Sequence, residues 1–282
     1  MSLRLTAALG QYPHTAPLRD GRVTSSRLMF EFKDVVPVNR AFRPMVNDLV
    51  YDVSEMALVT LMLGRAMGRP LRGLPVVLMR QSAHALLTVR ADSPLADVRE
   101  LHGKTIGVRA YTQTTGTWVR GILQHQFGLD LSTLRWVTFE PAHVDGFQDP
   151  SNCRRAAPGQ TLLGMILAGE VDAAIGLEPH PEVRPLLPGG AEQDFVRQTG
   201  VRPINHVLTL REALAQDRPW LTSELFSVFS EARQRAIAED EADPADYGLA
   251  ANKAAIELLA QYATEQGIIE RAYAATELFD VF

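Results

Sequence analysis

The sequence predicts an α/β fold with largely parallel sheets, divided into two lobes of related build. Short apolar runs alternate along the chain with segments of helical spacing, which is typical of sheets covered by helices. The length of 282 residues is sufficient for about two domains. An aspartate also stands at a helix-to-strand transition in each half of the chain, at Asp52 and at Asp172. This repeated pattern favours two similar units about 120 residues apart.

The N-terminal part is expected to alternate between strands and helices. Its strands are runs in which apolar residues alternate or are continuous. One helix is predicted from Ser54 as N-cap, with Glu55 at the positive helix start and apolar residues at helical spacing from Ala57 onward. The expected elements are a strand over 3–9, a loop over 10–21, extended chain over 23–32, a short helix over 40–49, a strand over 51–53, a helix over 54–67, and strands over 74–79 and 85–89.

The middle of the chain repeats this alternation and the last part is mainly helical. From Arg218 onward we expect helices, with a break at Pro244. The elements expected before that point are a short helix over 93–101, a strand over 104–109, a helix ending near 127, a strand over 134–139, a loop over 141–159, a helix over 160–168, a strand over 171–177, a proline-rich connection over 179–190 and a strand over 203–210.

Charge and hydropathy exclude several classes of protein. The chain has 28 Lys and Arg against 33 Asp and Glu, a net charge of -5, so it lacks the basic excess of a non-specific nucleic-acid or anionic-membrane binder. No stretch approaches the ~20 apolar residues of a membrane span. The apolar run over 3–9 is too short for the core of a signal peptide. We therefore expect a cytoplasmic protein.

The cysteine and histidine content indicates neither a disulfide nor a metal centre. The single cysteine, Cys153, excludes an intrachain disulfide and a cysteine metal site, and it is expected to be an inert thiol. The seven histidines lie far apart and form no pair at i, i+4 spacing with another ligand-type residue. The glycine-rich nucleotide fingerprint is absent. The sequence thus predicts no cofactor and no bound metal.

The segment over 104–121 carries the clearest indication of a binding site. A predicted strand ends at Arg109, and the polar turn Tyr111-Thr112-Gln113-Thr114-Thr115-Gly116 leads into a helix. Such a helix start offers unpaired N–H groups, hydroxyls and the positive end of the helix dipole, which together favour an anion. We expect a small carboxylate to bind there through Thr114 and Thr115, although one of these threonines can also serve only as an N-cap.

Other candidate side chains stand at predicted strand ends, where open α/β sheets bind their ligands. Ser54 and Glu55 belong to the strand-to-helix turn of the first lobe, and Glu178 follows the strand over 171–177. For Ser54 the alternative is plain capping, and for Glu178 it is a solvated loop carboxylate. The titratable or cationic candidates at other strand ends are His14, Arg80, Arg109 and His206.

Four stretches stand in order along nearly the whole chain: Leu18-Arg19-Asp20-Gly21 after Tyr12 and Thr15; Tyr51-Asp52-Val53-Ser54-Glu55-Met56; Tyr111 with Thr114, Trp118, Arg120 and Gly121; and Pro203-Ile204-Asn205-His206. Together they resemble the 4,5-dihydroxyphthalate decarboxylase family. This resemblance implies a two-lobed type II periplasmic-binding-protein-like fold with a ligand cleft between the lobes. One lobe would comprise 1–88 and 207–282, and the other 89–206.

The resemblance also implies a cofactor-independent decarboxylase acting on a hydroxylated aromatic carboxylate, with no nucleic-acid or membrane partner and with homo-oligomer formation left open. The carboxylate-binding candidates are Arg80, Arg109, Thr114 and Thr115, and the other ligand-binding candidates are Tyr12, Ser54, Tyr111 and Trp118. The candidates for proton transfer are His206, His14, Glu55 and Glu178. We rank His206 first, because it has a counterpart in the family pattern.

The sequence departs from the family pattern at two places. The family has Asp-Arg where Pro13-His14 stands, and Arg-His where Arg80-Gln81 stands. Since fold alone does not determine function, a second hypothesis stays open, a non-catalytic binding protein or sensor for a small carboxylate. Release of CO2 from hydroxybenzoates distinguishes the two.

Overall fold

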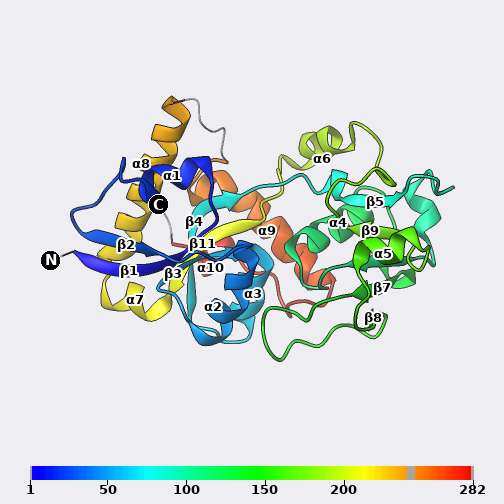
Figure 1. The fold of residues 1–282 in the computed structure, drawn as a ribbon, viewed down its shortest axis with the longest axis horizontal. Helices are drawn as coiled ribbons and strands as arrows, with labels where there is room; N and C mark the ends of the chain where they lie inside the picture. Colours follow the sequence, from blue (N-terminus) through cyan, green and yellow to red (C-terminus); the bar gives the residue numbers. More distant parts are fainter. Residues whose placement is uncertain (1, 240–244, 281–282) are drawn as a thin grey trace. The chain divides into compact units, whose positions relative to one another are not determined.

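Two β-sheets, one in each of two units, organise the chain (Figure 1). The computed structural model describes residues 2–239 and 245–280, so the break expected at Pro244 lies outside the described residues. Unit 1 comprises the residues up to Arg80, Ile204–Ala260 and the residues from Arg271 onward. Unit 2 comprises Gln81–Pro203 and Gln261–Glu270. Residues 261–270, which the sequence analysis assigns to the first lobe, thus group with unit 2.

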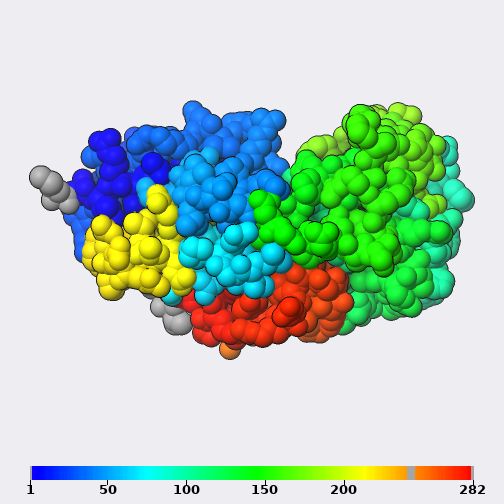
Figure 2. Space-filling model, turned by 90° about the horizontal axis from the view of Figure 1, so that it is seen from below, coloured from blue at the N-terminus to red at the C-terminus, as the bar shows by residue number. Residues whose placement is uncertain are grey.

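The sheet of unit 1 combines strands from both ends of the chain. In spatial order it contains β2 (Leu28–Phe32), β1 (Leu3–Ala8), β3 (Val53–Ala57), β11 (His206–Arg211) and β4 (Leu71–Met79). β1 runs parallel to β2 and β3, whereas β11 runs antiparallel to β3 and β4. The sheet is therefore mixed, because the late strand β11 is inserted between two early strands. In the space-filling view the residues near 215 (yellow) accordingly lie beside the N-terminal residues (blue) (Figure 2).

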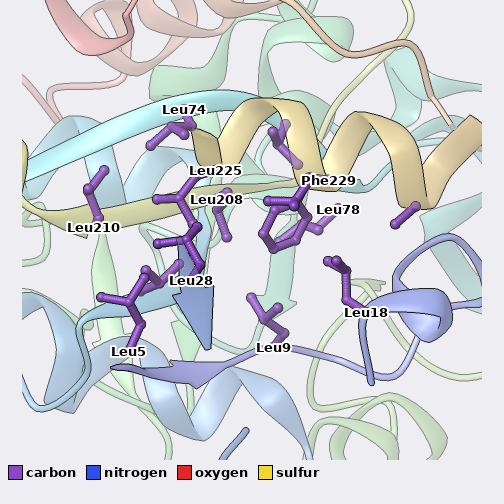
Figure 3. Close-up of a cluster of buried hydrophobic side chains, with 14 of the residues drawn as sticks. Leu5, Leu9, Leu18, Leu28, Leu74, Leu78, Leu208, Leu210, Leu225 and Phe229 are labelled. Atoms are coloured by element: carbon purple, nitrogen blue, oxygen red, sulfur yellow. The ribbon is translucent and has the colours of Figure 1, made fainter. Parts of the chain in front are cut away.

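Helices cover this sheet and complete its core. They are α1 (Ala16–Arg19), α2 (Phe42–Asp48), α3 (Leu58–Ala66), α7 (Glu212–Asp217), α8 (Trp220–Ala238), α9 (Leu249–Glu265) and α10 (Ala275–Leu278), with 3₁₀ turns η1 (Pro13–Thr15) and η2 (Val38–Ala41). α9 contributes its residues up to Ala260 to unit 1. Leu225 and Phe229 of α8 pack into a buried cluster with strand residues such as Leu5 and Leu208 (Figure 3). The burial of this apolar surface stabilises unit 1.

The segment from Val53 to Ala57 differs from the prediction. It forms the fully buried strand β3, and α3 begins only at Leu58, with Ala57 as its N-cap residue. Ser54 is therefore not a helix cap: its hydroxyl donates to backbone carbonyls of Ala8 and Glu55 inside the sheet. The neighbours β1 and β11 provide hydrogen-bond partners on both sides of this segment, and these tertiary contacts override the local capping signal.

Unit 2 contains the second mixed sheet. In spatial order its strands are β10 (Val183–Pro185), β5 (Leu87–Arg90), β9 (Ala173–Ile175), β6 (Thr105–Val108), β7 (Arg135–Thr138) and β8 (Cys153–Arg155). The pairs from β9 to β8 are parallel, and the two pairs at the β5 end are antiparallel. The helical elements are α4 (Thr114–His125), α5 (Leu162–Leu167) and α6 (Ala191–Thr199), with 3₁₀ turns η3 (His84–Leu86), η4 (Val98–Leu101) and η5 (Leu131–Thr133).

The two aspartates of the repeated sequence pattern occupy equivalent positions in the two sheets. Asp52 directly precedes β3 and accepts hydrogen bonds from the backbone N–H and the hydroxyl of Thr6, each at 2.8 Å. Asp172 directly precedes β9 and accepts a bond from the backbone N–H of Thr105 at 2.9 Å. In both cases the N–H of the aspartate returns a bond to the carbonyl of that threonine. Each unit therefore has the same aspartate–threonine hydrogen bonds at the start of a central strand, β3 in unit 1 and β9 in unit 2.

Some elements were not predicted. Helix α6 follows the proline-rich connection and was not predicted. Its sequence does contain helix-boundary signals, namely Glu192 and Asp194 in the first turn and Gly200 after the end. Strand β8 lies in the expected loop over 141–159, and β10 in the connection over 179–190. In the part of the chain that the structure describes, no helix is long and apolar enough to cross a membrane.

Candidate functional site

A buried carboxylate lies in the sheet of unit 1. The Glu55 side chain on β3 has no exposed surface (0%) and accepts three hydrogen bonds. Its Oε1 accepts from the Tyr12 hydroxyl at 2.7 Å and from His206 Nδ1 at 2.6 Å, and its Oε2 accepts from the backbone N–H of Gly10 at 2.8 Å. We call Glu55, Gly10, Tyr12 and His206 the Glu55 group.

Strand register brings these residues together from three distant parts of the sequence. In the antiparallel pair of β3 and β11, Leu208 lies opposite Glu55 and His206 lies opposite Ala57. Glu55 and His206 are therefore diagonal neighbours on one face of the sheet, within reach of long side chains. β1 is the other neighbour of β3, so Gly10, just beyond its end, arrives beside Glu55.

The hydrogen bonds favour the ionised form of Glu55. Burial by itself would raise the pKa of this carboxyl, because a charge is poorly solvated inside the protein. The hydrogen bond and positive charge of His206, with the bonds from Tyr12 and Gly10, outweigh burial and lower the pKa of Glu55 below its ordinary value. Glu55 is thus an acceptor for all three donors near neutral pH.

His206 is held by one ring nitrogen. Because Glu55 is ionised, Nδ1 carries a hydrogen and donates it to the carboxylate. The imidazole also meets the Phe42 ring edge-on, with the ring centres 5.0 Å apart. Its side chain is 15% exposed, and among the described residues Nε2 has no hydrogen-bond partner. Nδ1 is thus engaged by Glu55, whereas Nε2 makes no hydrogen bond within the described chain.

Tyr12 and His14 form a stacked pair beside the Glu55 group. Their ring centres are 5.2 Å apart. Burial, followed by the charge and hydrogen bond of Glu55, raises the pKa of Tyr12, so its hydroxyl stays protonated. Burial lowers the pKa of His14 to about 4, and its Nε2 is buried without a hydrogen-bond partner in the described chain. His14 is therefore neutral at neutral pH.

Two hollows in unit 1 adjoin Tyr12. One, of about 300 Å³, is lined by Leu9, Gly10, Gln11, Tyr12, Asp34, Val35, Val36 and Val38. The second, of about 360 Å³, is lined by Gln11, Tyr12, Pro13, Ala16, Arg19 and Asp20. Since Tyr12 and Gln11 line both, and Tyr12 bonds Glu55, a ligand in either hollow would lie close to the Glu55 group.

The candidates expected in the segment over 104–121, around the start of α4, lie in unit 2. Thr114 and Thr115 are the first residues of α4 and both are buried. Arg109 follows β6 and forms an ion pair with Glu140 at 3.0 Å. The buried Tyr111 donates its hydroxyl hydrogen to the carbonyl of Gln266 at 3.2 Å. These residues belong to one helix start, as predicted, but the cation and the tyrosine have partners within the protein.

Arg120 of α4 is a buried cation that the sequence analysis did not rank as a site residue. It is 1% exposed and donates to Gln266 Oε1 and to the carbonyl of Tyr111, each at 2.6 Å. Its guanidinium also lies over the Tyr111 ring, and its Nη1 has no hydrogen-bond partner among the described residues. Its positive charge therefore adds to the positive potential near the first turn of α4.

The other candidates are either buried in the core or exposed on the surface. Ser54 and Trp118 are fully buried, and Trp118 packs edge-on against Tyr262. We therefore leave both out of the proposed site. Glu178 lies in an exposed loop of unit 2, and Arg80 is exposed at the end of β4.

The structure brings together four of the predicted residues, namely Tyr12, His14, Glu55 and His206. The backbone N–H of Gly10 was missed, because a backbone donor has no side-chain signature.

Two curated proteins named 4,5-dihydroxyphthalate decarboxylase are similar to this chain. The protein from Comamonas testosteroni is 30% identical over 261 residues, which cover 83% of this chain and 76% of that protein. The protein from Pseudomonas putida is 30% identical over 221 residues, which cover 69% of this chain and 82% of that protein. No family model matches the sequence.

Solved structures share the fold at low sequence identity. The alkanesulfonate-binding protein SsuA from Xanthomonas axonopodis pv. citri has a TM-score of 0.56 and 13% identity, covering 99% of this chain and 98% of that chain. The ligand-binding component of an ABC-type import system from Staphylococcus aureus has a TM-score of 0.60 and 9% identity, covering 99% and 97%. The desulfurization enzyme DSZB has a TM-score of 0.56 and 16% identity, covering 99% and 96%. The chain therefore has the α/β periplasmic-binding-protein-like fold that its sequence predicts.

Proposed function

This chain belongs to the 4,5-dihydroxyphthalate decarboxylase family, and we propose that it is a lyase that removes CO2 from a hydroxylated aromatic carboxylate, with His206 as the proton donor. The observation that carries the proposal is the hydrogen bond of 2.6 Å between His206 Nδ1 and the buried Glu55 carboxylate. Such a pair fixes the tautomer and the orientation of an imidazole, as a carboxylate does in hydrolytic triads.

The proposed step exchanges a carboxylate for a proton at one ring carbon. Electron density from a ring hydroxyl flows into the ring, and Nε2 of the protonated His206 transfers its proton to the carbon that bears the carboxylate. The bond from this carbon to the carboxylate then breaks, CO2 leaves, and the electron pair of that bond restores the aromatic ring. Solvent returns a proton to His206. A positioned acid contributes typically ~10²–10⁴-fold in rate.

Glu55 and Tyr12 act on this step through His206. The Glu55 carboxylate keeps Nδ1 hydrogen-bonded through the whole cycle, so Nε2 alone faces the reaction. Tyr12 and the Gly10 N–H hold the carboxylate in place from the other side. Both Glu55 and Tyr12 are therefore positioning residues. His14 is a weaker candidate for the acid than His206, because burial lowers its pKa to about 4.

Independently of this chemistry, the start of α4 in unit 2 is an anion site that we also propose. The dipole of a 12-residue helix, the two threonines and the nearby charge of Arg120 all favour an anion there. Arg109 is a weaker contributor, because it forms an ion pair with Glu140.

The alternative is a non-catalytic binding protein for a small carboxylate, as the fold of SsuA-like proteins allows. Incubation of the purified protein with 4,5-dihydroxyphthalate and a panel of hydroxybenzoates in D2O distinguishes the two. We expect CO2 release with one deuterium at the ring position that carried the carboxylate. Saturable binding of these acids without any CO2 release would overturn the lyase and favour the binding protein.

A further inference from the structure

The peptide unit that joins Leu9 to Gly10 is hydrogen-bonded at both ends. Its carbonyl oxygen, on Leu9, accepts from Arg19 Nη2 at 2.6 Å. Its N–H, on Gly10, donates to Glu55 Oε2 at 2.8 Å. The peptide bond is trans, so the oxygen and the hydrogen point in opposite directions. A guanidinium and a carboxylate, two opposite charges, therefore bind the two ends of one peptide dipole.

The fold of unit 1 holds Arg19 at the Leu9 carbonyl. Arg19 is the last residue of α1, and the residue before it, Leu18, lies in the same buried cluster as Leu9 (Figure 3). The guanidinium carbon lies 4.5 Å from the centre of the Phe32 ring. Within the described chain the bond to Leu9 is the only hydrogen bond of this side chain, and Nε is buried without a partner. The charge of Arg19 thus acts on a carbonyl and not on a directly bonded carboxylate.

One oxygen of the Glu55 carboxylate depends on the Gly10 N–H. Oε1 accepts from Tyr12 and His206, whereas Oε2 accepts only from Gly10 among the described residues. The Glu55 side chain has no exposed surface, so bulk water does not reach this oxygen. Leaving an oxygen of a buried carboxylate unpaired is costly. The bond from Gly10 is therefore a principal restraint on the orientation of the carboxylate.

The Tyr12 ring packs directly against Gly10. A Cβ at position 10 would lie 2.6 Å from Tyr12 Cε2 and 2.8 Å from the Tyr12 hydroxyl oxygen. That hydroxyl donates to Glu55 Oε1 at 2.7 Å. A single arrangement of residues 9–12 thus supplies two of the three donors to Glu55, and the bond from Arg19 to the Leu9 carbonyl helps to fix this arrangement.

We propose that Arg19 is a positioning residue for the proton transfer and that it acts on His206 through the Leu9–Gly10 peptide and the Glu55 carboxylate. The proposal rests on the proposed function and adds a residue to its machinery. A cation on the carbonyl polarises the peptide, which makes the N–H a stronger donor to the carboxylate. Glu55 is then held more firmly, and it orients the imidazole through Nδ1. The effect requires no contact between Arg19 and the substrate.

The test combines the kinetics of CO2 release from 4,5-dihydroxyphthalate with the NMR signal of the Gly10 amide proton. We expect Arg19→Met to lower kcat by about 3- to 10-fold, as for one lost hydrogen bond, and to leave KM within about twofold of the wild type. The Gly10 amide proton should move upfield, because a weaker hydrogen bond deshields it less. Arg19→Lys keeps the charge and a donor for Leu9, so its losses should be smaller. The control Arg4→Met, in which an exposed arginine of β1 is replaced, should match the wild type.

A double-mutant cycle separates this role from a general loss of structure. In the Glu55→Gln background the carboxylate is absent, so Arg19→Met should lower kcat by less than about twofold further. A loss of the same size in both backgrounds would overturn the proposal. A raised KM with unchanged kcat would overturn it as well, and would indicate that Arg19 binds the substrate directly.

If Arg19→Met does not fold, Arg19→Lys decides. A small loss of kcat with a small shift of the Gly10 signal supports the proposal, and a loss of kcat with an unchanged Gly10 signal overturns it. Wild-type kcat and an unshifted Gly10 signal in Arg19→Met refute the role of Arg19 and leave the lyase intact. A shifted Gly10 signal in Arg19→Met, in a protein whose wild type releases no CO2, refutes the lyase instead and leaves the hold of Arg19 on Glu55 standing.

Discussion

His206 Nδ1 lies 2.6 Å from Oε1 of Glu55, although the two residues are 151 positions apart in the sequence. One is the first residue of β11, which enters the sheet late and antiparallel, and the other is in the middle of β3. The contact therefore depends on the crossing of the chain back into the N-terminal sheet. It joins a fully buried carboxylate to a partly exposed imidazole, an arrangement that can deliver a proton from a fixed direction.

Replacing Glu55 by Gln removes the charge and one of the acceptor sites while keeping the side-chain volume. Three donors then compete for one amide oxygen, so we expect turnover to fall at least about tenfold and the free energy of unfolding to fall by about 1–3 kcal/mol. Steady-state kinetics and urea unfolding measure these effects. Tyr12→Phe is the matched control, because it keeps the ring stack on His14 and removes a single donor; its losses should be smaller. Wild-type turnover in Glu55→Gln would contradict the role of the carboxylate.

The same carboxylate gives a pH dependence of stability. In the folded protein the pKa of Glu55 is lowered from its ordinary 4.5. Its contribution to stability is therefore present above pH 4.5 and is lost as the pH falls through the folded value. Urea unfolding of the wild type and Glu55→Gln below pH 4.5 checks this point: the difference between them should shrink as the pH falls.

The buried His14 should make the protein less stable as the pH falls, in a higher pH range than Glu55 does. Burial lowers its pKa from 6.5 to about 4. As the pH falls below 6.5 the unfolded chain binds a proton before the folded protein does, so stability is complete above 6.5 and falls between 6.5 and about 4. At about 1.4 kcal/mol per pH unit the loss amounts to about 3 kcal/mol. His14→Phe, which retains an aromatic ring against Tyr12, should lose less over this window in urea unfolding. Equal slopes would refute a buried neutral His14.

Much of the fold was predictable because its signals are local. The equivalent positions of Asp52 and Asp172 follow from a short pattern that each half of the chain repeats, and both aspartates bind a threonine of the neighbouring strand. The boundary at Ser54 was not predictable from local signals. Its serine and glutamate match a helix start, and only the burial of β3 between β1 and β11 makes this segment a strand.

The residues of the candidate site could be predicted from the sequence, but the hydrogen bonds between them could not. His206 and Glu55 were each expected at strand ends, yet their contact depends on the register of β3 and β11, which no local pattern encodes. The resemblance to the decarboxylase family identified Tyr12, although its hydroxyl contact with Glu55 was not expected.

The close contact between Gly121 and Tyr262 leaves no room for a side chain at position 121. A Cβ at this position of α4 would lie 2.0 Å from Tyr262 Cδ2. The Tyr262 ring cannot withdraw easily, since it stacks on His125 and meets Trp118 edge-on. Gly121→Ala should lower the free energy of unfolding by at least about 1–3 kcal/mol in urea. The control is Gly189→Ala, which meets no atom within 4 Å and should be nearly neutral. Equal stability of the two variants would be inconsistent with this packing.

The anion site that we propose at the start of α4 leads to a prediction for ligand affinity. Thr114→Val together with Thr115→Val keeps the size of both buried side chains and removes their hydroxyls. The loss of a hydrogen bond to a charged group costs ~1.5–3 kcal/mol, so carboxylate affinity should fall about tenfold or more. Isothermal titration with a panel of small carboxylates measures this. Unchanged affinity for every carboxylate would exclude the site.

The most direct test of the central claim is the turnover of His206→Asn beside its ligand binding. Asparagine is of similar size and can still donate a hydrogen bond to Glu55, but it cannot supply the proton. We predict that CO2 release falls by ~10²–10⁴-fold, the usual contribution of a positioned acid, while substrate affinity stays within a few-fold of the wild type. A His206→Asn variant that releases CO2 at the wild-type rate would contradict the assignment of His206 as the proton donor.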